Sequence, residues 1–227
     1  MRLSVIIPCL NEAAHIRRTL EALAPLRARG HEVIVVDGGS SDATPELARV
    51  LADRVVAVPR GRALQMNAGA ALASGDVLVF LHADTLLPPE ADAAVCGGLA
   101  RSGRLWGRFD VRIDDNDVLL ALVARLMNLR SRATGIATGD QALFVRREIF
   151  ARVGGFPELP LMEDIALCKR LKSLARPLCL ADVAVTSGRR WRERGVLRTI
   201  ALMWWLRLQF FFGAAPSRLA RSYSGRS

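Results

Sequence analysis

The sequence predicts an α/β fold built around a mainly parallel sheet, and two observations lead to this prediction. Short apolar runs alternate with helical patterns over the first part of the chain, which is typical of βαβ units. Two of these runs, Val33–Val36 and Val77–Leu81, have no polar interruption, as is typical of strands buried on both faces. The first is followed by Asp37 and the second leads to Asp84. Because parallel strands present their carboxyl ends at one edge of the sheet, we expect a ligand site there.

The first half of the chain is expected to supply four strands and three helices. Asn11 is a suitable N-cap and Gly30 a suitable stop for the first helix, and Thr44-Pro45 has the cap-then-proline start of the second. The expected strands are 3–8, 32–36, 54–58 and 77–84, and the expected helices are 12–29, 44–51 and 63–73.

The second half has a different rhythm. Residues 105–113 alternate between apolar and polar, which predicts a strand with one exposed face, and Glu163–Leu174 has a strong helical pattern. Further helices are expected at 90–100, at 118–129 and from 146, and a strand at 141–145. No linker separates domains, so we expect a single domain over 1–195, with a nucleotide-binding half (1–88) and an acceptor half (89–195). An apolar helix and a basic tail follow at 196–227.

Composition limits the class of protein without fixing it. The chain has 227 residues, 51% of them hydrophobic, and a net charge of +10 that is almost all arginine. This suffices for a sizeable core. A basic balance fits nucleic acid, an anionic membrane or a phosphorylated substrate, and it also fits a merely solvated surface. The four cysteines have no metal-finger spacing and no signal peptide opens the chain, so we expect a cytoplasmic protein.

The segment 196–213 is apolar on nearly all sides. Arg198 and Arg207 fall on opposite sides of a helix, and the run is too interrupted for a bilayer span. Trp204 and Trp205 beside arginine suit a membrane interface. Three interpretations stay open: a peripheral contact with the inner face of the membrane, a homodimer contact, and packing on the core.

Four motifs follow one another at fitting intervals. They are Val5-Ile6-Ile7-Pro8-Cys9-Leu10-Asn11-Glu12, then Val36–Thr44 with Asp37-Gly38-Gly39, then the strand end at His82-Ala83-Asp84, and finally Gly154-Gly155-Phe156 with Glu163-Asp164. Together they resemble the inverting family-2 glycosyltransferases of GT-A fold over nearly the whole chain. The details at 61–67, 139–141 and 189–191 are similar to the group described as radical-SAM/selenodomain-associated transferase 2.

The resemblance implies a nucleotide-sugar donor, UDP- or GDP-linked, an unknown acceptor and no nucleic acid. The residues expected at the nucleotide are Pro8, Glu12, Asp37, Arg62 and Asn67. Alternatives stay open: Asp37 could form a turn before its two glycines, Arg62 could be a surface residue, and Asn67 could pack a helix. Gly38 stands where the family often has a second aspartate.

Asp84 is the expected ligand of a divalent metal, Mn²⁺ or Mg²⁺. Such an ion bridges a carboxylate to a diphosphate and acts as a Lewis acid for the leaving group. His82 takes the position of the first acid in a D-x-D motif, where it is either a metal ligand or a packed histidine at the strand end.

Asp164 is the expected catalytic base. It begins a helix, where the dipole favours the ionised carboxylate that takes a proton from the acceptor. One base without an enzyme nucleophile implies a single displacement with inversion at the anomeric carbon; the alternative is that the acids only cap the helix. The residues expected to face the acceptor or the diphosphate are Asp140, Gln141, Glu163, Arg190 and Trp191.

Two other functions are alternatives to glycosyl transfer. A sugar-nucleotide pyrophosphorylase would need a glycine-rich loop after the first strand, and residues 8–12 contain no glycine. A non-catalytic basic module that binds membrane or nucleic acid is favoured only by the charge. Acidic strand ends repel phosphate unless a cation intervenes, so that module leaves Asp37, Asp84 and Asp164 unexplained.

Overall fold

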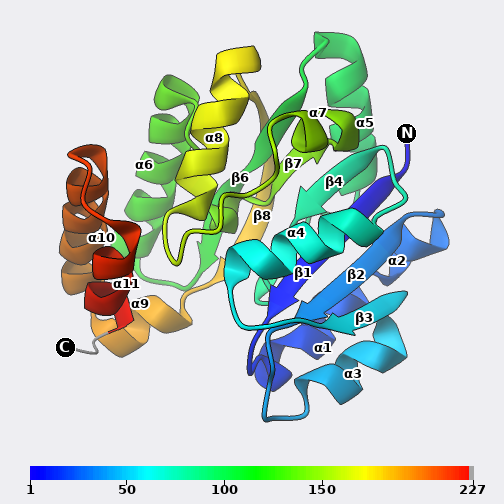
Figure 1. Cartoon of the computed structure of the whole chain (residues 1–227), viewed down its shortest axis with the longest axis horizontal. Coiled ribbons are helices and arrows are strands. Elements are labelled where there is room, and N and C mark those ends of the chain that lie inside the picture. Colours follow the sequence, from blue (N-terminus) through cyan, green and yellow to red (C-terminus); the bar gives the residue numbers. More distant parts are fainter. Residues whose placement is uncertain (225–227) are drawn as a thin grey trace.

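One sheet of eight strands runs through the molecule, with helices packed on both of its faces (Figure 1). The computed structural model describes residues 1–224. The strands are β1 (Leu3–Cys9), β2 (Glu32–Asp37), β3 (Arg54–Ala57), β4 (Val77–Phe80), β5 (Thr85–Leu86), β6 (Trp106–Asp114), β7 (Leu143–Arg146) and β8 (Leu178–Ser187). The helices are α1 (Ala13–Ala22), α2 (Ala24–Ala28), α3 (Thr44–Leu51), α4 (Arg62–Leu72), α5 (Ala91–Ser102), α6 (Val118–Thr134), η1 (Gly139–Gln141), α7 (Arg147–Arg152), α8 (Glu163–Leu174), α9 (Arg189–Arg194), α10 (Val196–Phe211) and α11 (Pro216–Ser224).

The strand order is β3-β2-β1-β4-β7-β6-β8-β5. Strands β3, β2, β1 and β4 are mutually parallel, and β6 is parallel to β8. Strand β7 runs antiparallel between β4 and β6, and the short β5 runs antiparallel to β8. The predicted α/β architecture with a mainly parallel sheet is therefore confirmed. It brings the carboxyl ends of β1, β2 and β4 to one edge.

Two hydrophobic layers cover the sheet because successive side chains of a strand point to opposite faces. In β1, Val5 and Ile7 join the layer beneath α1, whereas Ile6 joins the layer beneath α4 and α8. All three side chains are fully buried. The same alternation in β2 and β4 holds the central strands rigidly, and this fixes the positions of the residues that follow each strand.

Two expected elements were wrong in extent, and a third was only partly right in its exposure. The helix expected at 12–29 is two helices, α1 and α2, because Pro25 has no N–H to continue the first one. The strand expected at 77–84 ends at Phe80, so His82 and Asp84 lie in the turn beyond it. The strand expected at 105–113 was predicted to expose one face, and this holds only for its second half, where Arg112 and Asp114 are exposed. In its first half Arg108 is fully buried against Asp110, because β6 is an inner strand.

The C-terminal helices α9–α11 lie together at one end of the molecule, beside α6 and α8 (Figure 1). Leu206 and Leu219 are fully buried there against Met162 and Ile165 at the start of α8. Part of the expected apolar helix thus packs on the core, as one of the three interpretations proposed. The end of the expected basic tail, residues 225–227, lies outside the described residues. Within residues 1–224, no helix is both long and apolar enough to cross a membrane.

Candidate active site

Asp37 ends β2 and organises the turn that follows. Its carboxylate accepts hydrogen bonds from the backbone N–H groups of Gly39 and Ser40, at 3.0 and 2.9 Å, and from the Ser40 hydroxyl. The Cys9 thiol also points at it, at 3.7 Å. The side chain is buried, so the turn-forming role that was weighed against nucleotide binding is present in this structure. A contact with the nucleotide would replace one of these donors, and it stays a prediction.

Gly38 leaves room for the side chain of Gln65, a residue whose sequence context gave no sign of a role here. A Cβ atom at Gly38 would lie 3.1 Å from the amide of Gln65, which is buried. That amide donates to the carbonyl oxygens of Cys9 and Val36, both at 2.8 Å. Gln65 therefore ties the ends of β1 and β2 together from α4. A side chain at position 38 would crowd the amide that makes this link.

His82 and Asp140 form a pair at the end of β4. The His82 Nδ1 atom lies 3.2 Å from the Asp140 Oδ1 atom, and a Cβ atom at Gly139 would lie 2.1 Å from His82 Nε2. Only glycine at 139 lets the ring sit here. Burial raises the pKa of Asp140, but the hydrogen bond and charge of His82, with Arg190 and Arg62, lower it to about 2. His82 is thus packed against η1.

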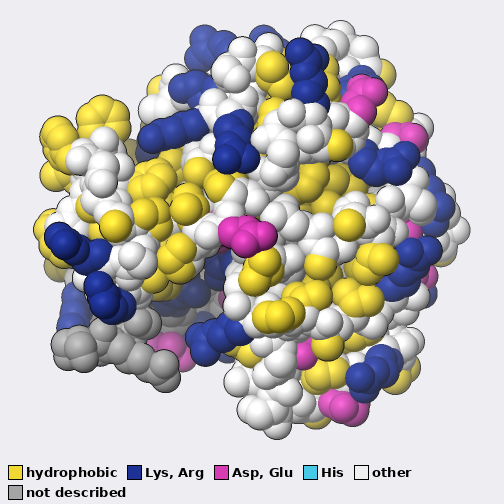
Figure 2. Space-filling model, viewed as in Figure 1, with side chains coloured by type: hydrophobic (Ala, Val, Ile, Leu, Met, Phe, Trp, Pro, Cys, Tyr) yellow, Lys and Arg dark blue, Asp and Glu magenta, His cyan; other side chains and the backbone are white. Residues whose placement is uncertain are grey.

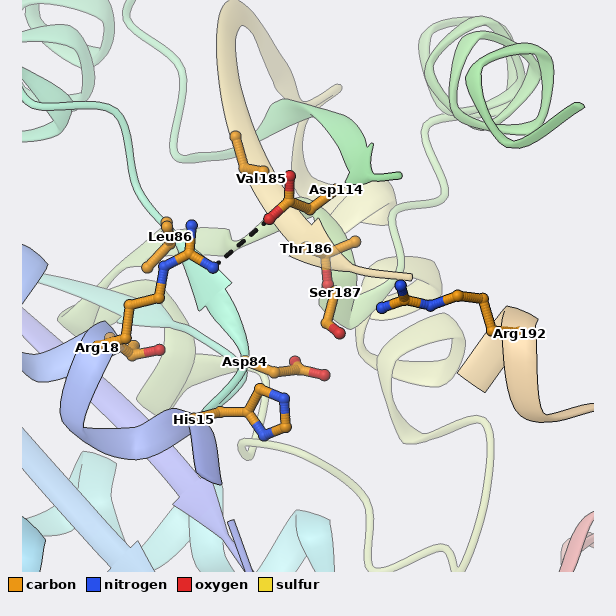
Figure 3. Close-up of a pocket in the computed structure, with 10 residues that line it drawn as sticks. His15, Arg18, Asp84, Leu86, Asp114, Val185, Thr186, Ser187 and Arg192 are labelled. Carbon is orange, nitrogen blue, oxygen red and sulfur yellow. Dashed lines mark ion pairs between the residues drawn. The ribbon is translucent and has the colours of Figure 1, made fainter. Parts of the chain in front are cut away.

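Asp84, two residues further on, opens into a different pocket, here called the Asp84 pocket (Figure 3). Among the described residues the Asp84 carboxylate has no hydrogen bond or ion pair, and Arg192 reaches in from the opposite side. The other lining residues are His15, Arg18, Thr19, Leu86, Asp114, Val185, Thr186 and Ser187. No group of three or more His, Cys, Asp or Glu side chains within residues 1–224 could hold a metal. Any cation here would need oxygen ligands from a substrate.

Glu12 meets the C-terminal segment rather than standing free. Its two carboxylate oxygens each lie 3.3 Å from the Arg189 guanidinium, and the Nδ1 atom of His15 lies 3.4 Å from one of them. Its backbone N–H donates to Thr44. The sequence around Glu12 gave no sign of Arg189 as a partner. Glu12 and Arg189 connect the start of α1 to α9, and His15, which also contacts Glu12, lines the Asp84 pocket.

Asp164 lies in a second pocket, here called the Asp164 pocket. Its carboxylate accepts the N–H groups of Ile165, at 2.7 Å, and of Gly139, at 3.1 Å. Burial and the charge of Glu163 raise the pKa of Asp164 to about 6, although these N–H groups and Arg62 act against the rise. The other lining residues are Pro8, Arg62, Met66, Phe80, Leu81, His82, Gly139, Leu143, Phe156 and Glu163.

Arg62 brings a positive charge to the same pocket. Its guanidinium lies 3.7 Å from the carboxylate of Glu163, which is buried, while the arginine side chain is 45% exposed. Arg62 is therefore neither an isolated surface residue nor fully engaged in an ion pair. Pro8, from the end of β1, lines the pocket beside it. Pro8 and Arg62 come from the first half of the chain, and Glu163 and Asp164 come from the second. The structure brings all four together in this pocket.

Three residues expected at the site have partners within the protein. Both polar atoms of the Asn67 amide bond the backbone of Phe156, which joins α4 to the turn before α8. Gln141 is fully buried, and its amide is used by Thr138, Asn128 and Ser131. Trp191 packs on the cluster between β6 and α6. For Asn67 these bonds are those of the packing alternative. A ligand contact of Asn67, Gln141 or Trp191 stays a prediction, and it would compete with the contacts described here.

Two further basic residues approach the Asp164 pocket. Arg190 lies over the ring of Tyr223 on α11, 5.5 Å from its centroid. Arg130 on α6 has two buried guanidinium nitrogens, Nε and Nη2, without a hydrogen-bond partner within the described residues. Burial lowers the pKa of Arg130, and the negative charges of Asp164 and Asp140 oppose this. Nothing in the sequence around Arg130 distinguishes it from the other arginines of α6.

Backbone conformation is unusual at three points around the site. Within residues 1–224, the non-glycine residues with a left-handed backbone are Asn11, Ala142 and Met162, with φ of 55°, 44° and 68°. They follow β1, follow η1 and precede α8, respectively. Such conformations cluster at functional sites, where surrounding packing maintains them.

The mixed eight-stranded sheet with helices on both faces is the GT-A fold, as the solved structures below show. Residues 4–153 match the family described as Glycosyl transferase family 2. The chain belongs to this family.

Relatives and solved structures agree with this assignment. The chain is 39% identical to the succinoglycan biosynthesis protein ExoA of Rhizobium meliloti, over 78% of this chain and 60% of ExoA. The mannosyltransferase PcManGT of Pyrobaculum calidifontis, in complex with GDP-Man and Mn²⁺, superposes with a TM-score of 0.61 at 26% identity, covering 81% of this chain and 56% of PcManGT. S. aureus TarS 1–349 with UDP-GlcNAc gives 0.66 at 19% identity, covering 82% and 58%. The chain spans about half to three-fifths of the length of the first curated relatives it matches.

Proposed function

We propose that this chain transfers a sugar from a nucleotide-sugar donor to an acceptor hydroxyl, with Asp164 as the general base. One observation carries the proposal. Asp164 lines a pocket that the end of β4 also lines, and the next acid beyond β4, Asp84, opens onto the neighbouring pocket. Glycosyl transfer has two needs: the acceptor hydroxyl must lose a proton, and the charge of the donor's diphosphate must be neutralised. Asp164, on one side of the turn after β4, would meet the first need as a base. Asp84, an unpaired carboxylate on the other side, would meet the second by holding a cation.

Two backbone N–H groups support Asp164 as the base. The groups of Gly139 and Ile165 fix the orientation of the carboxylate, so little reorientation is needed when it takes a proton. A raised pKa makes Asp164 a stronger base than an ordinary aspartate while it is still ionised at neutral pH. No enzyme nucleophile is required in this scheme. The acceptor oxygen attacks the anomeric carbon as the nucleotide leaves, which inverts that centre.

Asp84 is the residue that would hold a divalent cation. A hard cation such as Mg²⁺ binds through one or two carboxylates together with substrate phosphates, and Asp84 offers one carboxylate that no described side chain neutralises. When bound, such an ion supplies positive charge to the departing diphosphate. Arg189 and Arg192 stand near the same turn and would add charge-assisted contacts to phosphate oxygens. PcManGT binds GDP-Man with Mn²⁺, which supports a metal-assisted donor site here.

A screen of sugar nucleotides tests the proposed donor class. We expect one UDP- or GDP-sugar to raise the melting temperature by about 5–10 °C at a concentration 100 times its Kd, because ligand binding stabilises the native state by mass action. The measurement is a thermal-shift assay of the whole chain with and without Mn²⁺. The matching free sugars serve as controls, since they lack the diphosphate. If no nucleotide shifts the melting temperature under either condition, the proposed function is wrong.

The activity should depend on pH through Asp164. The base acts only when it is ionised, so its raised pKa predicts that kcat/KM falls about tenfold per unit below a pH of about 6. Glu163→Gln removes the negative charge that helps to raise this pKa, so the acid limb should move to lower pH. Glu158→Gln, on an exposed side chain between the glycines and α8, is the control and should leave the limb in place. An unmoved limb in Glu163→Gln would contradict the assignment.

A further inference from the structure

Helix α10 exposes an apolar stripe along one side. Leu197, Trp204, Leu208 and Phe211 recur at helical spacing, and all are more than half exposed, Phe211 at 75%. The next large side chains around the helix are also exposed: Trp205 and Phe212. The opposite side of α10, represented by Leu206, is buried on the start of α8. The packing of α10 on α8 therefore uses one side of the helix and leaves the apolar stripe on its other side exposed to solvent.

Helix α6 has a second stripe of the same kind. Its exposed side chains are Val118, Leu119, Leu122, Leu126 and Leu129, again at helical spacing. Its inner side, with Leu120 and Ala124, packs on β6. The sequence predicted an apolar helix here but no reason for its outer side to be apolar.

The two stripes occur at the same end of the molecule. Val196, where α10 begins, belongs to the cluster that also contains Leu120 and Val123 of α6. Figure 1 places α6, α10 and α11 together at this end, away from α3. Figure 2 shows hydrophobic side chains gathered over the outer tip of this end, with basic side chains beside them. Exposed apolar surface of this extent, on adjacent helices, marks a contact surface. We call the two stripes together the α6–α10 face.

Charge decides which partner fits. Helices α6, α10 and α11 contain no aspartate or glutamate at all. Their exposed basic side chains are Arg125, Arg132, Arg198, Arg218 and Arg221, and of these Arg132 pairs with Asp110 of β6. In a symmetric dimer through this face, the arginines of one copy would lie opposite the same arginines of the other copy. These helices carry no acid to neutralise them, so their repulsion would oppose association. A surface that is itself anionic meets both the apolar and the basic side chains favourably.

We propose that the α6–α10 face docks the protein on an anionic lipid bilayer. Tryptophan and phenylalanine beside arginine are the side chains that helices lying in a membrane interface use. The apolar stripes would enter the acyl boundary and the arginines would contact lipid phosphates. This goes beyond the proposed function, because it concerns where the protein resides rather than what its site does. The docked end is the one against which the helix carrying Asp164 is packed.

Vesicle co-sedimentation of the whole chain tests the docking surface. We expect binding to vesicles of phosphatidylcholine with phosphatidylglycerol at least about tenfold stronger than to phosphatidylcholine alone, and weaker binding at high salt. Tryptophan emission should shift to the blue on binding because Trp204 and Trp205 leave water. Trp204→Ser with Phe211→Ser should reduce binding at least about tenfold. Val50→Ser, an equally exposed apolar residue on α3, is the matched control and should bind normally.

Two further measurements keep the test decisive. Circular dichroism and an unchanged cooperative thermal melt of the double variant establish that it is folded, so a loss of vesicle binding is a loss of docking. Arg198→Gln with Arg218→Gln should lose the preference for the anionic vesicles. Absence of vesicle binding by the unaltered chain would overturn the proposal. So would a concentration-dependent dimer in sedimentation velocity that Trp204→Ser abolishes. Neither outcome depends on glycosyl transfer, so a failure of the docking proposal would leave the proposed function untouched.

Discussion

Asp164→Asn is expected to reduce glycosyl transfer by about 10³-fold while leaving donor binding nearly intact. The size follows from the loss of the general base, which typically contributes 10²–10⁴-fold. Asparagine keeps the shape but cannot take the acceptor proton. One of the two N–H groups that the carboxylate binds, from Gly139 or Ile165, would lose its acceptor, at a cost of about 1 kcal/mol in stability. Steady-state kinetics and calorimetric titration with the donor separate the two effects.

A matched variant controls for the negative charge in the pocket. Asp140→Asn also removes a carboxylate beside Gly139, but that carboxylate is engaged by His82 and should not serve as the base. Its kcat should stay within about tenfold of the unaltered enzyme. If Asp164→Asn transfers sugar at the normal rate, Asp164 is not the base. If Asp140→Asn shows the larger loss, the base has been assigned to the wrong acid.

Asp84→Asn is expected to weaken metal-dependent donor binding by at least about tenfold. A neutral amide oxygen is a poorer ligand for a hard cation than a carboxylate, and the other ligands would come from the donor's phosphates and water. The measurement is calorimetric titration with the nucleotide in the presence of Mn²⁺ and in the presence of a chelator. The unaltered protein should show a large metal effect and Asp84→Asn little of it.

Asp114→Asn serves as the control for this prediction. Asp114 lines the same pocket, but its carboxylate already pairs with Arg18 at 3.5 Å, so it has a partner within the protein. Its substitution should leave the metal effect on donor binding unchanged. Equal nucleotide affinity with and without metal in the unaltered protein would refute the role of Asp84.

The parts of the fold that depend on burial could be predicted from the sequence. Uninterrupted apolar runs located the central strands, and the pattern of Glu163–Leu174 gave α8 with its correct bounds. Strand β8 was missed because several of its side chains are exposed, and its position depends on pairing with β6. The division of the first expected helix into α1 and α2 shows a limit of such patterns. The helical periodicity of the sequence continues through Pro25, which cannot continue a helix that began before it.

The sequence predicted that Asp84 and Asp164 would lie near one edge of the sheet, but not the direction of the side chains around them. Strand-end acids and the start of α8 identified where Asp84 and Asp164 lie. Whether a nearby amide faces a ligand depends on tertiary contacts, and so Asn67 and Gln141 could not be told from binding residues. Gln65, whose amide lies beside Gly38, was missed for the same reason: its partners are backbone carbonyls of two strands that are distant from it in the sequence.

Met162 links the outer end of the molecule to its chemistry. A left-handed backbone costs a residue with a side chain on the order of 1–2 kcal/mol, and Met162 adopts one immediately before Glu163 and Asp164. It is held in place by Leu206 and Leu219 of the C-terminal helices. The contacts of α10 and α11 thus help to maintain the backbone conformation from which the helix of both carboxylates begins. A substitution that removes Leu206 or Leu219 from this cluster would therefore act on the chemistry without touching a substrate.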